Sequence, residues 1–198
     1  TVNHTEKPDR AAAMLLEGRV VILVDGTPFV LFIPNLFIEY LHVSEDYYER
    51  FLFVSAVRLL RFIAMIISLT LPALYITAVS FHYEIFPTPL LLSIAAQREA
   101  APFPVFIEVF VMEFTFEILR EAGIRLPRPI GQAISIVGAL VIGEAAVRAG
   151  LVASATVIIV AFTGIASFTL FYSVSISFRL LRFTFILVSA VLGLFGLI

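Results

Sequence analysis

The chain has 198 residues, of which 61% are hydrophobic and 14% are charged, and its mean hydropathy is +1.05. A soluble domain is typically about 45–50% apolar and about 25% charged, so the composition predicts an integral membrane protein of about four or five spans. The net charge of −2 is too small to indicate a nucleic-acid partner, and the lack of cysteine excludes disulfides and thiolate chemistry.

Residues 11–34 predict a β-hairpin. Two runs rich in Val, Ile and Phe flank Asp25-Gly26, a dipeptide typical of tight hairpin turns. The polar stretch TVNHTEKPDR precedes them, and we expect the sequence to be a segment of a longer protein. Residues 1–34 would then be the remnant of a cytoplasmic N-terminal domain, and residues 35–198 the transmembrane domain.

Residues 35–50 predict a segment that approaches the membrane along its surface. They read as a helix, a break at Ser44 that caps the next helix, and three tyrosines suited to the bilayer–water interface. Residues 51–81 form the first predicted span, with Pro72 inside it.

The stretch Leu90 to Glu99 is too short to cross a bilayer, and we expect it to lie in the interface as an amphipathic helix. It carries Arg98 and Glu99, which are candidates for coupling neighbouring subunits.

Residues 103–121 predict a second long helix, which carries several acids. Glu113 and Glu117 share one face at a spacing of four residues. An uncompensated acid at a bilayer centre costs about 2.5–3.5 kcal/mol on insertion scales. These two therefore either line a cation vestibule or pair with an arginine, such as Arg120 or one on the first span.

Residues 130–149 predict a span with two faces. One face is made of small residues that let another helix approach closely, as helices do in lipid. Its packing candidates are Gly131, Ser135, Gly138 and Ala145. The opposite arc carries Val137, Leu140 and Val141, with Glu144 near the far end.

Two hypotheses for this arc remain open. In a ring of subunits it would form a hydrophobic collar that closes a pore by dewetting, with Glu144 favouring cations at the mouth. Alternatively, the arc faces lipid and Glu144 reaches the interface.

The sequence predicts two further spans, at residues 153–170 and 180–198, joined by the polar link YSVSISF. The distribution of arginines between the loops predicts a cytoplasmic N-terminus and an outside C-terminus. The three histidines lie far apart and no enzyme motif is present, so we expect neither a metal, nor a cofactor, nor catalysis.

Several long stretches resemble the GerA family of spore germination receptor A subunits, which includes the SpoVAF-type paralogues. They are VDGTPF at 24–29, SEDYYERF at 44–51, PTPLLLSIAAQRE at 87–99, FEILREAGIRLPRPIGQAISIVGALVIGEAAV at 116–147 and RLLRF at 179–183.

The resemblance implies a subunit of a nutrient-sensing complex in the spore inner membrane. Its partners would be a transporter-like B subunit and a lipoprotein C subunit. The A subunits would form a homo-oligomer, suspected to be a pentamer, that conducts monovalent cations when germinant binds. The alternatives are a non-conducting membrane scaffold and, less favoured because no repeated pair of broken helices is visible, a secondary carrier.

Overall fold

The computed structural model describes residues 2–43, 46, 48–99, 101–127, 138, 141–169 and 172–197. These residues form two compact units, Thr1–Phe62 and Ile63–Ile198, here called the N-terminal unit and the helical unit. The boundary falls within one long helix, whereas the sequence prediction placed a domain boundary after residue 34. That functional division stays a prediction, because compactness alone does not test it.

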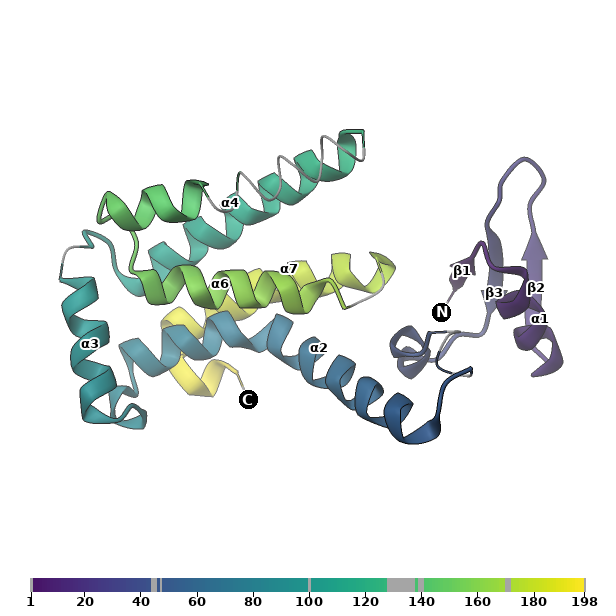
Figure 1. Ribbon diagram of the computed structural model, residues 1–198, viewed down its shortest axis with the longest axis horizontal. Coiled ribbons are helices and arrows are strands. Elements are labelled where there is room, and N and C mark those ends of the chain that lie inside the picture. The colour runs from purple at the N-terminus through teal and green to yellow at the C-terminus, as the bar shows by residue number, and fades with distance from the viewer. Residues whose placement is uncertain are drawn as a thin grey trace. The chain divides into compact units, whose positions relative to one another are not determined.

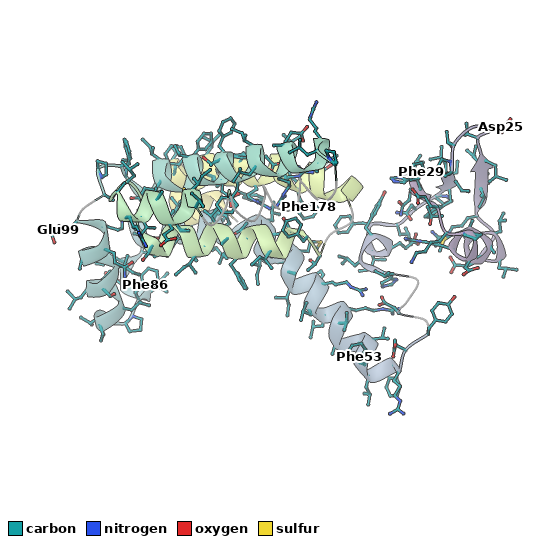
Figure 2. All side chains as sticks on the ribbon, turned by 45° about the horizontal axis from the view of Figure 1, so that its top comes forward. Asp25, Phe29, Phe53, Phe86, Glu99 and Phe178 are labelled. Carbon is teal, nitrogen blue, oxygen red and sulfur yellow. The ribbon has the colours of Figure 1, made fainter. Side chains whose placement is uncertain are left out.

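The N-terminal unit contains a three-stranded antiparallel sheet with the order β1-β3-β2. Its elements are β1 (Asn3–Thr5), α1 (Pro8–Leu16), β2 (Val20–Leu23), β3 (Val30–Ile33) and the 3-10 helix η1 (Phe37–Leu41). Strands β2 and β3 form the predicted hairpin, with Val20 opposite Ile33 and Leu23 opposite Val30. Asp25 lies at its tip (Figure 2).

The connection between β2 and β3 is longer than the two-residue turn that Asp25-Gly26 indicated. Gly26 has a φ of 83°, which suits a turn glycine. Pro28 follows and has no N–H to donate to a strand ladder, so pairing resumes at Val30. Strand β3 buries Phe32 completely, and this residue is the core of the sheet.

The described part of the helical unit consists mainly of helices. They are α2 (Phe51–Ser80), α3 (Thr88–Arg98), α4 (Val105–Arg125), α6 (Ser154–Ser167) and α7 (Tyr172–Leu192), with the short 3-10 helices η3 (Tyr83–Ile85) and η4 (Gly193–Gly196). Residues 141–148 are also helical. Figure 1 shows α4, α6 and α7 running alongside one another and α3 lying across one end of them.

One apolar core joins α2, α4 and α7. Its buried members are Tyr75 and Ile76, Val105 and Val109, and Ile186. Partly buried residues of α6 pack against it, and a second cluster joins α4 to α6 through Met112 and Val160. The helices are therefore held together by side chains from segments far apart in sequence.

Among the described residues, two helices are long and apolar enough to cross a membrane, Phe51–Ser80 and Ile176–Gly196. The predicted four or five spans are not confirmed. Helix α4 is too rich in charge, and α6 has 14 residues, about 21 Å at 1.5 Å per residue, which is short of a bilayer core of about 30 Å. Most of the predicted span at 130–149 lies outside the described residues.

The prediction that YSVSISF is a polar link between two helices is wrong. Helix α7 begins at Tyr172 and includes all of it. Neither Gly nor Pro interrupts this stretch, so its serines do not end the helix. The predicted helix within 35–50 is the 3-10 turn η1, and Ser44 lies outside the described residues.

Candidate functional site: a charged seam along helix α4

Charged side chains line α4 on the faces that meet α3, α6 and α7. We call this set the charged seam, and it consists of Arg98 from α3, Glu108, Glu113, Glu117 and Arg120 from α4, and Arg179 and Arg182 from α7. Because these charged groups lie between packed helices, they are the strongest candidates for function or for fixing the helix packing.

Glu113 and Arg182 form the most deeply buried pair of the seam. Their closest atoms are 2.9 Å apart, and the side chains are 4% and 3% exposed. Arg182 also donates through Nε to the carbonyl oxygen of Ser68 on α2 at 2.7 Å. Glu113 Oε1 and Arg182 Nη2 are buried without a hydrogen-bond partner. Removing one member of such a pair would leave a buried charge without its counterion.

Glu117 lies between two arginines. It accepts a hydrogen bond from Arg179 of α7, and Arg120 Nη1 lies 3.8 Å from its other oxygen. Arg120 reaches α6 as well, where Nη2 donates to Ser167 Oγ at 2.7 Å and the guanidinium lies 5.0 Å from the centre of the Phe168 ring. Arg120 therefore links α4 to α6 by a hydrogen bond and a cation–π contact.

Glu108 occupies the third position of the seam and is almost completely buried. Its Oε2 accepts hydrogen bonds from the Ala153 N–H at 3.0 Å and the Thr156 hydroxyl at 3.1 Å. Its Oε1 lies 3.7 Å from Arg98 Nη2. Because Thr156 Oγ1 is also 3.3 Å from the Tyr75 hydroxyl, this carboxylate connects α3, α6 and α2 to α4.

The seam holds four arginines against three glutamates, so it carries no excess of negative charge. Each acid lies within 4 Å of at least one guanidinium. A row of guanidinium groups repels a passing cation. A buried ion pair between two helices favours the packing in which the two charges meet, because any other leaves one charge buried without its partner. The geometry is that of a packing seam joined by ion pairs.

Arg179 and Arg182 were missed as partners by sequence reasoning, which looked to Arg120 or the first span. The arginines of the first span, Arg58 and Arg61, instead bind Asp46. The sequence did contain a signal for these partners, because Arg179 and Arg182 are three residues apart and so share a face of a helix, as Glu113 and Glu117 do. Whether Glu113 and Glu117 also border a vestibule stays a prediction.

The pore and packing candidates are only partly within the described residues. Val137, Leu140, Gly131 and Ser135 lie outside them. Val141 is 55% exposed, and Glu144 pairs with Arg148 one turn further on, at 2.5 Å. Ala145 is exposed, whereas a Cβ added to Gly138 would lie 2.7 Å from Leu119 of α4. A role of Gly138 in helix packing stays a prediction.

The two coupling candidates differ in their surroundings. Arg98 turns toward Glu108 within the same chain. Glu99 is exposed and lies at the C-terminal end of α3 (Figure 2). A role in coupling subunits stays a prediction for both, and the intrachain contact of Arg98 favours Glu99 as the residue that can reach a neighbour.

A second charged group lies in the N-terminal unit, where Asp46 binds the first turns of α2. Arg61 donates to both oxygens of Asp46, at 2.7 and 2.9 Å. Burial opposes ionisation of Asp46, but hydrogen bonds from Arg61 and from the Val43 N–H hold its pKa below the usual value. Burial, followed by the charge of Arg58, lowers the pKa of His42.

The N-terminal unit also contains a cavity of about 340 Å³ between α1 and η1. Arg19 and Glu39 line it and bind each other through two hydrogen bonds. The bond from Arg19 lowers the pKa of Glu39 below its usual value, although burial opposes the shift. No group of three potential metal ligands occurs among the described His, Asp and Glu residues.

Comparison with known proteins gives the family. The family model described as Bacillus/Clostridium GerA spore germination protein matches residues 1–198. Spore germination protein KA of Bacillus subtilis (strain 168) is 58% identical over 199 residues, which cover 100% of this chain and 37% of the relative. Spore germination protein GerLA of Bacillus cereus is 50% identical over 98% of the chain and 40% of the relative.

Spore germination protein A1 of Bacillus subtilis (strain 168) is 48% identical over 100% of this chain and 41% of the relative. The chain thus spans about two fifths of the length of these relatives. No solved structure matches the chain. Family membership and the two membrane-capable helices found among the described residues together suggest a membrane protein. The chain belongs to the GerA family of spore germination proteins.

Proposed function

We propose that the chain is the membrane part of an A-type subunit of a nutrient-responsive spore germination receptor. It works in the spore inner membrane with its N-terminus in the cytoplasm. Several copies, five by the family resemblance, form a germinant-gated channel for monovalent cations. A transporter-like B subunit and a lipoprotein C subunit complete the receptor, and the chain itself catalyses no reaction.

The observation that carries this proposal, beyond the family match, is the pairing of every acid in the charged seam. Glu108, Glu113 and Glu117 each face an arginine of the same chain. One subunit thus offers no unpaired row of acids along α4 for a cation to follow. A pathway formed between copies, lined by a different helix, fits this charge distribution better than one through a single subunit.

The helical residues 141–148 are the best candidates for that lining. Val141 is more than half exposed within one chain, so its side chain is available to a pore or to a neighbouring copy. Together with Val137 and Leu140 it would form the hydrophobic collar. Glu144 would lie near the mouth, where Arg148 reduces its attraction for cations because the two form an ion pair.

Flux measurements on the full-length receptor in liposomes test this proposal. We expect K⁺ flux that rises when germinant is added, and Val141→Ser should increase the flux without germinant because a polar side chain favours water in the collar. Ile158→Ser on α6 is the matched control, since Ile158 is also strongly exposed but belongs to another helix. Equal flux in both variants would argue against the collar.

A non-conducting scaffold is the second candidate. The same pairing of acids and arginines supports it. A scaffold must keep its helices in one arrangement, and buried ion pairs between helices favour the arrangement in which each charge has its partner. A complete receptor that shows no flux with germinant, while the A-type subunit still holds its partners, would favour the scaffold. Saturable and stereospecific uptake would instead indicate a carrier.

A further inference from the structure

Helix α2 contains a proline, and this leaves one of its carbonyl groups without a helical partner. In an α-helix each carbonyl accepts from the N–H four residues further on. For Ser68 that residue is Pro72, which has no N–H and whose ring crowds the same carbonyl. Ser68 and Pro72 are both fully buried, so no bulk water reaches this oxygen.

Arg182 of α7 supplies the missing hydrogen bond. Its Nε donates to the Ser68 carbonyl oxygen at 2.7 Å, across 114 residues of sequence. Its Nη1 donates at the same time to Glu113 of α4 at 2.9 Å. One planar guanidinium on α7 thus binds two other helices, α2 and α4, and its fixed fork of donors allows both bonds at once.

We propose that Arg182 is a positioning residue that replaces the absent N–H of Pro72 and thereby holds α7 and α4 on the proline-interrupted part of α2. A buried acceptor left without a donor is costly, so α2 tolerates Pro72 at this position because Arg182 is present. The inference goes beyond the proposed channel, since it concerns the packing of three helices and does not depend on conduction.

Two substitutions separate this role from that of a simple buried charge. Arg182→Lys keeps the positive charge opposite Glu113. A lysine has a single side-chain nitrogen, however, and lacks the fork of donors with which arginine reaches both Glu113 and the Ser68 carbonyl oxygen. Pro72→Ala restores an N–H to the backbone, and Ser68 then has its own helical donor. If Arg182 does the work of that N–H, the two substitutions are coupled.

The experiment is a double-mutant cycle on the full-length protein in detergent micelles, measured as the midpoint of heat-induced loss of the folded species. We expect Arg182→Lys to lower the midpoint, and Pro72→Ala to remove roughly half or more of that shift. Arg179→Lys is the matched control, because Arg179 binds Glu117 on the same face of α7. Its shift should be the same with and without Pro72.

Equal shifts from Arg182→Lys in both backgrounds would overturn the proposal. The proposal would also be overturned if Arg182→Lys failed to accumulate both alone and together with Pro72→Ala. The N–H restored by Pro72→Ala should recover part of the stability that Arg182→Lys loses. Accumulation only together with Pro72→Ala would support it. The readout is independent of ion flux, so a negative result here leaves the proposed channel untouched, and a receptor without flux leaves this inference untouched.

Discussion

The carboxylate of Glu108 on α4 accepts a hydrogen bond from the hydroxyl of Thr156 on α6 at 3.1 Å, and a second from the Ala153 N–H at 3.0 Å. Ala153 directly precedes α6, so a side chain of one helix caps the first turn of another. The N-terminus of a helix carries unpaired N–H groups and partial positive charge, both of which an acid satisfies. The other oxygen of Glu108 faces Arg98, which fixes α3 to the same point.

Replacing this acid should be among the most damaging single changes in the helical unit. Glu108→Ala removes the cap of α6 and leaves the partly buried Arg98 without its carboxylate. We expect a loss of about 3–5 kcal/mol in the free energy of unfolding, measured by denaturant titration of the full-length protein in micelles. Glu108→Gln retains one acceptor oxygen, and its loss should be smaller.

Glu99→Ala provides the comparison for Glu108→Ala, since Glu99 is exposed at the end of α3. A surface change of this kind should stay within about 0.5 kcal/mol. Similar losses at the two positions would mean that Glu108 does not act as a cap.

The pair Glu117–Arg179 should show energetic coupling in a double-mutant cycle of Glu117→Gln and Arg179→Gln. Both side chains are largely buried between α4 and α7, so we expect a coupling free energy of about 0.5–3 kcal/mol. The control is Glu121–Arg125, an ion pair on the exposed side of α4 at 2.7 Å. Exposed pairs one turn apart contribute about 0.3–0.5 kcal/mol, and a coupling no larger than this at Glu117 would be the contrary result.

These pairs show what the sequence can and cannot predict. The β-hairpin around Asp25-Gly26 was predictable because turn chemistry is local. The shared face of Glu113 and Glu117 was equally visible, since helical spacing fixes it. Their partners lie 69 and 62 residues away, and the packing of α7 on α4 decides which arginine reaches which acid.

Helix ends were less predictable than helix faces. The serine-rich start of α7 looked like a link because serine competes for backbone hydrogen bonds, yet the segment is helical. The span expected at 153–170 is only the 14 residues of α6, whose first turn depends on Glu108 from another helix. Composition predicted a membrane protein. It could not predict the number of crossings, because this depends on whether the charged helix α4 crosses the bilayer.

Acid should weaken the N-terminal unit through Glu39. The hydrogen bond from Arg19 holds the pKa of Glu39 below its usual value of 4.5 in the folded state. The ionised carboxylate therefore stabilises the fold fully above pH 4.5, and this contribution is lost as the pH falls through the lowered folded pKa. In melting curves taken from pH 7 to pH 3, the stability gap between wild type and Glu39→Gln should shrink below pH 4.5.

The exposed acid Glu49 is the reference for this pH series. As a surface change, Glu49→Gln should alter the stability at pH 7 by no more than about 0.5 kcal/mol. A constant gap between wild type and Glu39→Gln down to pH 3 would show that the Arg19–Glu39 pair does not contribute as proposed.

A side chain at Gly138 should force the end of the Leu119 side chain to move. A Cβ at Gly138 would lie 2.7 Å from Cδ2 of Leu119 on α4, closer than carbon atoms approach one another. Because only the flexible end of the half-buried Leu119 must move, we expect Gly138→Ala to cost about 1 kcal/mol in the free energy of unfolding, the lower end for overpacking. Adding Leu119→Ala should recover part of this loss, although Leu119→Ala alone is destabilising. If the two losses simply add, the glycine does not serve close packing between these helices.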